Sequence, residues 1–177
     1  ESNRGWSSIT SSADGNKLAA VEAGGQIYIN PHYKLAAACS SPSTTVNFAT
    51  NISPGPVTEA GQTVSFQVSN DNNSLFTTQP AISSNGTLTF TPGSSTGVAT
   101  VTVSVVDSGG TAFGGVDASL PETFTISVVP AVTSVSPPAG ARVGGTSVTI
   151  TGIGFTGATN VTFNSLQATS FTVVNDT

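Results

Sequence analysis

The hydrophobic and polar positions of this chain alternate along several short segments. Residues 100–106 read Thr-Val-Thr-Val-Ser-Val-Val, in which β-branched apolar residues and small hydroxyl residues take turns. This period of two places apolar side chains on one face of a pleated strand and hydroxyls on the other, as in a half-buried antiparallel sheet. The pattern predicts an all-β chain built from modules of the extracellular type rather than one organised around an active site.

Residues 6–29 carry three short strand patterns separated by turns. The expected strands are Trp6 to Ser11, Lys17 to Ala23 and Gln26 to Ile29, with turns at Asp14-Gly15 and Gly24-Gly25. Short runs divided by Asp-Gly and Gly-Gly predict antiparallel hairpins. This region is therefore predicted to be a three-stranded meander of about one propeller blade in size.

The same stretch, Trp6 to Tyr28, resembles a repeat of bacterial β-propellers of the neuraminidase or photosystem-assembly-factor type. Those repeats usually continue into a Ser-Thr-Asp-x-Gly-x-x-Trp turn, whereas Asn30-Pro-His-Tyr-Lys34 stands here. The resemblance implies a propeller-blade-like β-meander over residues 1–35, either a final blade or a repeat reused as a hairpin. Because a lone blade cannot bury both faces, we expect it to lean on another part of the protein.

Residues 36–45 are small and rich in Ser and Thr, which predicts a linker. The next module, residues 46–130, shows strand patterns at regular intervals over about 85 residues, as expected of an immunoglobulin-like (Ig-like) β-sandwich. An Asn85-Gly86 turn is expected before one of its strands. The expected inward residues are Val64, Phe66, Val68, Leu88, Phe90, Ala99, Val101, Val103, Val105, Phe124, Ile126 and Val128.

Three segments of this module carry a family resemblance. They are Pro80 to Pro92, Gly97 to Asp107 and Gly114 to Asp117, and together they resemble the Ig-like repeats of large bacterial surface proteins. The module has no cysteine pair and no core tryptophan, in which it differs from antibody domains and is similar to those repeats. The resemblance implies a sandwich held by its apolar core alone.

From Ala131 the pattern changes. Val132-Thr-Ser-Val-Ser-Pro-Pro-Ala-Gly140, Gly144-Gly-Thr-Ser-Val-Thr-Ile-Thr-Gly-Ile-Gly-Phe155 and Ala158-Thr-Asn-Val-Thr-Phe163 resemble the first half of an IPT/TIG domain, another Ig-like fold. A Gly-Gly turn precedes a strand, and Gly152-x-Gly154-Phe155 forms the bend after it, where a side chain would obstruct the turn.

We therefore expect tandem Ig-like β-sandwiches, the second covering residues 131–177. Ig-like sandwiches of this kind run to about 80 or 90 residues, so the last strands of the second are expected to be missing from these residues. A sandwich without its closing strands exposes a sheet edge and part of an apolar face. Either the rest of a longer polypeptide or a strand of a neighbouring subunit would cover them.

The charge, the apolar runs and the cysteine count of the chain argue against several classes of function. Only 7% of the residues are charged, and the net charge of −5 includes just four Lys and Arg, which leaves almost nothing to neutralise a nucleic-acid backbone. No apolar run approaches the roughly 20 residues that span a bilayer. The single cysteine, Cys39, excludes an internal disulfide. Leu35 to Cys39 superficially matches a lipidation box but lacks the hydrophobic segment before it. We expect an extracellular or cell-surface location.

Few residues offer chemistry. His32 and Cys39 are the only members of their kinds and are expected to be a linker histidine and a small apolar cysteine rather than a nucleophile pair. Asp107 and Asp117 bracket a Gly-rich loop and, with Asp71 or Glu122, would offer oxygen ligands to calcium, but no spacing matches a defined calcium loop. We expect solvated turn residues there. No catalytic, metal-binding or cofactor-binding residue is predicted.

The sequence bears on two kinds of covalent modification. Lys17 and Lys34 are the only lysines and lie outside the predicted sandwiches, so a Lys–Asn isopeptide bond is not expected there. Glycosylation sequons occur at a number close to that expected by chance in so Ser/Thr-rich a chain. They begin at Asn51, Asn72, Asn85, Asn160 and Asn175.

The sequence predicts a non-catalytic structural or adhesive module that acts as a semi-rigid spacer or stalk, because the Val128 to Val132 junction leaves little slack. Its expected partners are protein modules of the same or neighbouring chains. One alternative is a subunit of an extracellular filament assembled by strand complementation. Another is an accessory carbohydrate-binding region of a secreted polysaccharide-active enzyme. Trp6, Tyr28 and Tyr33 are the candidate platform for a surface glycan.

Overall fold

The structure is a computed structural model that describes residues 34–50, 52, 61–109 and 118–175 and, as backbone strands, residues 6–11, 18–22 and 27–29. A short 3-10 helix, η2 (Asn73–Leu75), precedes β7. The strands in chain order are β1 (Trp6–Ser11), β2 (Leu18–Glu22), β3 (Ile27–Ile29), β4 (Lys34–Ala38), β5 (Thr44–Asn47), β6 (Val64–Asn70), β7 (Phe76–Ile82), β8 (Thr87–Pro92), β9 (Gly97–Asp107), β10 (Glu122–Val129), β11 (Ala131–Ser136), β12 (Thr149–Ile153), β13 (Thr162–Phe163) and β14 (Leu166–Gln167).

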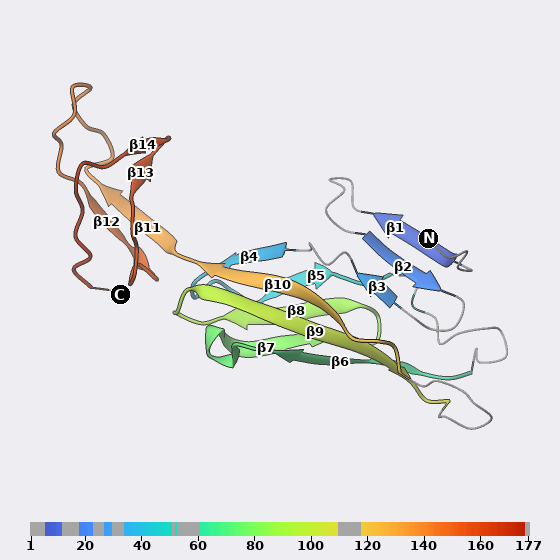
Figure 1. The fold of residues 1–177 in the computed structure, drawn as a ribbon. Coiled ribbons are helices and arrows are strands. Elements are labelled where there is room, and N and C mark those ends of the chain that lie inside the picture. The colour runs from blue at the N-terminus through green and yellow to red at the C-terminus, as the bar shows by residue number, and fades with distance from the viewer. Residues whose placement is uncertain are drawn as a thin grey trace.

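Strands β4 to β10 form a two-layered sandwich, drawn in the middle of Figure 1. One sheet has the order β4-β10-β9-β6 and the other the order β5-β8-β7. All neighbours are antiparallel except β4, which runs parallel to β10. With the strands lettered A to G in chain order, the sheets read A-G-F-C and B-E-D. This is the Ig-like order with the first strand moved to the second sheet.

The core of this sandwich follows from the alternation in its strands. In β9 and β10 every second residue is buried, because successive side chains of a strand point to opposite faces. The ring of Phe48 lies 4.7 Å from that of Phe124, and Phe76 meets Phe90 edge-on at 5.8 Å. The buried cluster comprises Ala37, Cys39, Leu75, Phe76, Ile82, Leu88, Phe90, Ala99, Val101, Val103, Phe124, Ile126 and Val128.

The predicted inward positions are confirmed except Val64, which is half-buried and is not among the residues that pack against the core cluster. All those of β8, β9 and β10 are buried, while Phe66 and Val68 of β6 are partly buried against the cluster. The outer face of the same sheet carries hydroxyls, with Thr123 opposite Thr102 and Thr125 opposite Thr100. This side of the sandwich is therefore mainly polar, with Lys34 opposite Thr125 as a charged residue on it.

The Asn85-Gly86 turn is present between β7 and β8. The Gly86 N–H donates to the carbonyl of Ser83 at 2.8 Å, and Asn85 Oδ1 accepts from the Thr87 N–H at 3.1 Å. Gly86 has φ +84°, and its carbonyl accepts from two consecutive N–H groups, those of Phe48 and Ala49. A Cβ at residue 86 would meet the Ala49 carbonyl group, so only glycine fits both the backbone angle and the close approach.

The expected boundary between meander, linker and sandwich differs in the structure. The residues 34–38, which the sequence divided between the meander (1–35) and the linker (36–45), form β4 and pair with β10. Part of the remaining expected linker forms β5, which pairs with β8. Ala-rich sequence has little intrinsic strand preference, so β4 depends on its pairing with β10, which a local pattern does not reveal.

The N-terminal strands form a separate antiparallel sheet of order β1-β2-β3, as the strand patterns predicted. The turns expected at Asp14-Gly15 and Gly24-Gly25 lie outside the described residues. No feature of the described strands identifies this sheet as a propeller blade.

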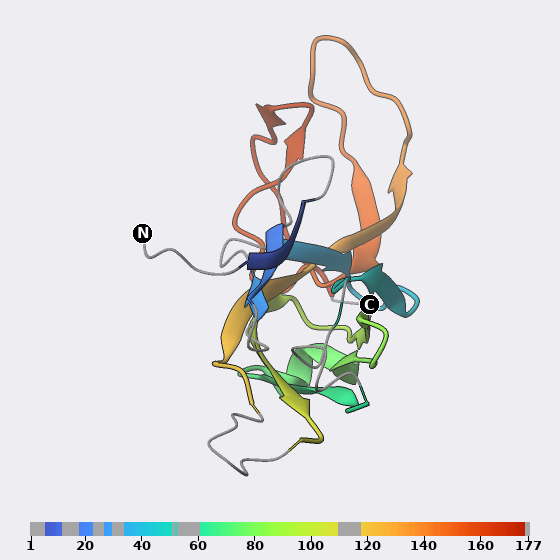
Figure 2. The same cartoon turned by 90° about the vertical axis from the view of Figure 1, so that its right-hand side faces the viewer.

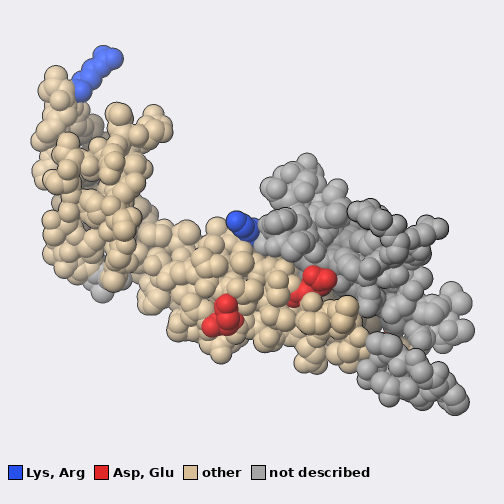
Figure 3. Space-filling view, in the orientation of Figure 1, with Lys and Arg blue, Asp and Glu red and all other residues tan. Residues whose placement is uncertain are grey.

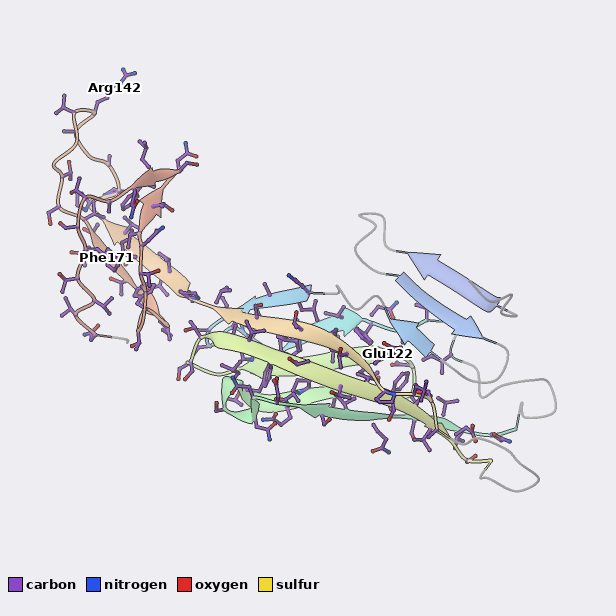
Figure 4. The ribbon with its side chains drawn as sticks, in the orientation of Figure 1. Glu122, Arg142 and Phe171 are labelled. Carbon is purple, nitrogen blue, oxygen red and sulfur yellow. The ribbon has the colours of Figure 1, made fainter. Side chains whose placement is uncertain are left out.

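The C-terminal residues 131–175, here called the C-terminal module, lie at the end of the molecule opposite β1–β3 (Figure 1). They contain the two-stranded sheets β11-β12 and β13-β14. The loop between β11 and β12 projects away from the sandwich in both views (Figures 1 and 2). Arg142 stands at the tip of this loop (Figure 4).

Candidate functional site

The junction between the sandwich and the C-terminal module is the best-defined candidate site. β10 ends at Val129 and β11 begins at Ala131, so one residue, Pro130, separates two strands of different sheets. This confirms the predicted short junction. The Cys39 N–H donates to the Val129 carbonyl at 2.8 Å, which fixes the end of β10 to the end of β4.

Apolar packing continues across this junction. Ala131 at the start of β11 and Ile153 at the end of β12 are partly buried against the core cluster of the sandwich. These two residues are paired with one another in the β11-β12 sheet. The C-terminal module therefore rests on the sandwich through the end of its own sheet.

Gly154 occupies a tight position where the C-terminal module meets the sandwich. It is buried, has φ +81°, and lies so close to the sandwich that a Cβ there would be 2.7 Å from Cys39 Sγ. The same Cβ would be 2.7 Å from Thr96 Cγ2 and 3.4 Å from Pro130 Cα. Real Cβ atoms essentially never approach other atoms within 3.0 Å. The site therefore accepts glycine for its space as well as for its backbone angle.

The bend predicted from Gly152-x-Gly154-Phe155 is confirmed. A Cβ at residue 152 would collide with the carbonyl of Ala131 across the sheet and with the ring of Phe155. A glycine two residues later turns the chain at the junction. The sequence predicted that side chains would obstruct this bend, but it did not show which segments of the sandwich lie opposite.

Cys39 is 3% exposed and belongs to the core cluster of the sandwich. The sequence placed it in an irregular stretch, where a small apolar cysteine was expected. Burial at the end of β4 follows from the pairing of that strand with β10. His32, its only candidate partner in nucleophilic chemistry, lies outside the described residues.

The C-terminal module exposes many apolar side chains. Among its described residues only Gly152 and Gly154 are buried, and the sole charged residue is Arg142. Phe171 lies in the segment after β14 (Figure 4) and is 40% exposed. The other large exposed apolar residues here are Val132, Val135, Val143, Phe163, Leu166, Val173 and Val174.

Two of the candidate calcium ligands, Asp71 and Asp107, lie far apart. Asp71 follows β6 and bonds to Thr100 near the start of β9, whereas Asp107 ends β9. Asp107 lies seven residue steps beyond Thr100 along the extended strand, which corresponds to about 24 Å. In the described ranges no group of three His, Cys, Asp or Glu residues is placed to hold a metal ion.

Each of these two carboxylates holds a backbone N–H group. Asp71 Oδ1 accepts from the Thr100 N–H at 2.7 Å, and this bond lowers the pKa of Asp71 from its usual 3.8. Asp107 Oδ1 accepts from the Gly109 N–H at 2.7 Å, as expected of a turn residue. Glu122 lies at the start of β10 opposite Val103 (Figure 4). Asp117 lies outside the described residues.

On the face shown in Figure 3, the charged side chains of the described residues are few and scattered. Lys34 is exposed at the start of β4, opposite Thr125 of β10. The expectation that Lys34 lies outside the sandwiches is therefore wrong, because β4 is one of the strands of the first sandwich. Lys17 lies outside the described residues.

The sequons and the aromatic candidates have different surroundings. Asn85 is exposed and accepts from Ser83 Oγ at 2.6 Å, whereas Asn72 Oδ1 accepts from Ser74 Oγ at 2.8 Å. Asn160 is exposed. Asn175 is also exposed, while Asn51, Tyr33 and the side chains of Trp6 and Tyr28 lie outside the described residues.

Within the described ranges, no helix combines the length and apolar character needed to cross a bilayer.

Comparison with known proteins identifies one part of the chain. Residues 130–177 match the IPT/TIG domain family. The C-terminal module is therefore an IPT/TIG Ig-like module, as the glycine and proline motifs predicted. No curated protein and no solved structure matches the chain.

Proposed function

We propose that this chain is a non-catalytic structural or adhesive module that acts as a semi-rigid spacer or stalk. The observation that carries the proposal is the junction, where one residue separates β10 from β11 and apolar packing is continuous across both sides. Two modules joined in this way keep a nearly fixed orientation, because bending them requires exposure of Ala131 and Ile153.

The surface supports the same function. The outer face of the sandwich presents hydroxyls, and the few charged side chains of the described residues are scattered on the face shown in Figure 3. The carboxylates of Asp71 and Asp107 are committed to backbone N–H groups. A Ser/Thr-rich, weakly charged coat around an apolar sandwich suits a secreted or cell-surface protein, in which the chain would hold neighbouring modules apart.

Small-angle X-ray scattering of the full chain at several concentrations tests the spacer role. We expect a scattering curve that one orientation of the C-terminal module on the sandwich reproduces. A curve that requires a broad set of orientations contradicts the proposal, because such a chain would behave as beads on a flexible string.

A second candidate function is a filament subunit. It is favoured by the exposed apolar side chains of the C-terminal module, among them Leu166 at 76% exposure and Val174 at 90%, on residues that carry no charge except Arg142. Apolar surface of this kind favours association, and unpaired strand edges accept further strands.

Electron microscopy of the purified chain over a range of concentrations distinguishes the two candidates. Regular fibres with a constant repeat indicate assembly between subunits. Short, separate rods at every concentration indicate a spacer and exclude self-assembly under those conditions.

A further inference from the structure

We propose that the close contact of Gly154 with the end of the sandwich, here called the seat, holds the C-terminal module in one orientation. This contact makes the two modules one rigid unit that unfolds cooperatively. The inference rests on the proposed spacer function and assigns its stiffness to one residue. It goes beyond the short junction, because a short connection limits the reach of a module without fixing its orientation.

The space around Gly154 is bounded by three segments of the sandwich end. Cys39 follows β4, Thr96 precedes β9, and Pro130 follows β10. All three lie within 3.4 Å of the position that a Cβ of residue 154 would occupy. Since these segments belong to one sheet, Gly154 lies against its end as a whole rather than against a single strand.

The atoms opposite Gly154 have little freedom to move away. Cys39 is 3% exposed within the core cluster, and Thr96 is half-buried and has a β-branched side chain with one strongly restricted torsion. A methyl group added between them must therefore displace the backbone of the C-terminal module. Added volume in a well-packed contact is destabilising for this reason.

The C-terminal module has few other means of staying in place. Its only buried described residues, Gly152 and Gly154, and its two residues packed on the core cluster, Ala131 and Ile153, all lie at the junction. A region with so few buried contacts elsewhere opens at low free-energy cost when its one packed end is disturbed. The seat at Gly154 therefore controls the order of the whole module.

The chain contains a residue whose reactivity reports whether the junction is closed. Cys39 is the single cysteine, its thiol is buried, and it lies directly opposite Gly154. A thiol reagent reaches a buried cysteine only when the surrounding structure opens. The rate of Cys39 modification by such a reagent in excess therefore measures opening of the structure around Cys39, of which Gly154 forms one side.

The test compares Gly154→Ala with Gly157→Ala in the full chain. Both glycines have nearly the same positive φ, +81° and +80°, so an alanine is strained at each. A Cβ at residue 157 meets nothing within 4 Å. Gly157→Ala is therefore a control for strain, and the difference between the variants isolates the contact with the sandwich.

We expect Gly154→Ala to raise the rate of Cys39 modification by about tenfold or more, as an overpacked contact implies. Gly157→Ala is expected to stay within about threefold of the unsubstituted chain, because an exposed loop residue has no part in the junction. Calorimetry is expected to give one transition for the unsubstituted chain and two for Gly154→Ala.

A third comparison tests whether the effect of Gly154→Ala arises from its contact with Cys39 Sγ and Thr96 Cγ2. In a Cys39→Ala, Thr96→Ser background the two atoms that the new methyl group would meet within 3.0 Å are removed, so Gly154→Ala should have a smaller effect on scattering and on the unfolding transitions. If the background does not relieve the effect, or if Gly154→Ala and Gly157→Ala behave alike, including a shared failure to fold, the seat does not hold the C-terminal module and the inference is overturned. In that event a single orientation of the unsubstituted chain in solution still supports the spacer function, whereas a broad set of orientations contradicts that function as well.

Discussion

Asp71 and Thr100 hold one another by a pair of hydrogen bonds at the end of the four-stranded sheet. Asp71 Oδ1 accepts from the Thr100 N–H at 2.7 Å, and the Asp71 N–H donates to the Thr100 carbonyl at 3.2 Å. The β6–β9 ladder is thus extended by one residue beyond the end of β6 at Asn70. A carboxylate that accepts a backbone N–H closes the ladder at this edge.

This pair makes the stability of the chain depend on pH. The hydrogen bonds to Thr100 lower the pKa of Asp71 below 3.8, so the folded state favours the carboxylate. A group with a lowered folded pKa contributes its stability above the unfolded pKa and loses it as the pH falls through the folded pKa. We therefore expect the stability advantage of the unsubstituted chain over Asp71→Asn to be present at pH 7 and to shrink below about pH 4.

Urea unfolding of both proteins from pH 7 to pH 2 measures this difference. Asp107→Asn is the control for loss of one negative charge, because the Asp107 carboxylate accepts from Gly109 within its own turn. An advantage that stays constant or grows on acidification contradicts the assignment to Asp71.

The alternation of β9 predicts opposite results for two valines. Val101 is fully buried and Val98 is 56% exposed, although both lie in the same strand. Val101→Ala is expected to lower the free energy of unfolding by about 2 kcal/mol, through lost burial and a residual cavity. Val98→Ala is expected to change it by less than about 0.5 kcal/mol. Equal losses, measured by denaturant unfolding, would show that the two faces of β9 are not distinct.

The turn before β8 predicts a severe effect of a single methyl group. Gly86→Ala forces an alanine into φ +84° and against the carbonyl of Ala49, so it should cost at least about 2 kcal/mol. Gly144→Ala is the matched control, because Gly144 also has φ +84° and a Cβ there meets nothing within 4 Å. Thermal unfolding checks both variants, and a Tm of Gly86→Ala equal to that of Gly144→Ala contradicts the close approach of Gly86 to Ala49.

Calcium should not stabilise the chain. The Asp71 and Asp107 carboxylates hold backbone N–H groups at sites about 24 Å apart along β9, so they cannot share one ion. We expect the Tm in excess calcium and in excess chelator to agree within about 1 °C, as linkage requires for a protein without a specific site. A rise in Tm that saturates with calcium concentration would reveal a site.

The parts of the fold that could be predicted from the sequence are those in which local pattern and burial agree. The alternation in β9 and β10 identified their inward residues, and Asn85-Gly86 identified a turn. β7 was not predicted, because Pro80 and two register shifts interrupt the alternation of its side chains. β4 was not predicted either. Its sequence Leu-Ala-Ala-Ala becomes a strand only by pairing with β10, which lies far away in the chain.

The junction could be predicted only in part, for the same reason. Gly152 and Gly154 marked a bend that tolerates no side chain, and the sequence around them indicated the IPT/TIG module. The contact of Gly154 with Cys39 joins residues more than a hundred positions apart, and no local pattern announces it. The sequence therefore assigned Cys39 to a linker of small residues, whereas Cys39 lies in the core of the sandwich opposite Gly154.

A semi-rigid spacer requires that the sandwich and the C-terminal module keep one orientation, and residual dipolar couplings of the unsubstituted chain measure this most directly. Amides of residues 61–109 report the alignment of the sandwich, and those of residues 131–175 report that of the C-terminal module. We predict that one alignment tensor fits both sets with the orientation seen in Figure 1. Two tensors of clearly different magnitude would mean that the modules move independently, and the account of a semi-rigid spacer would be wrong.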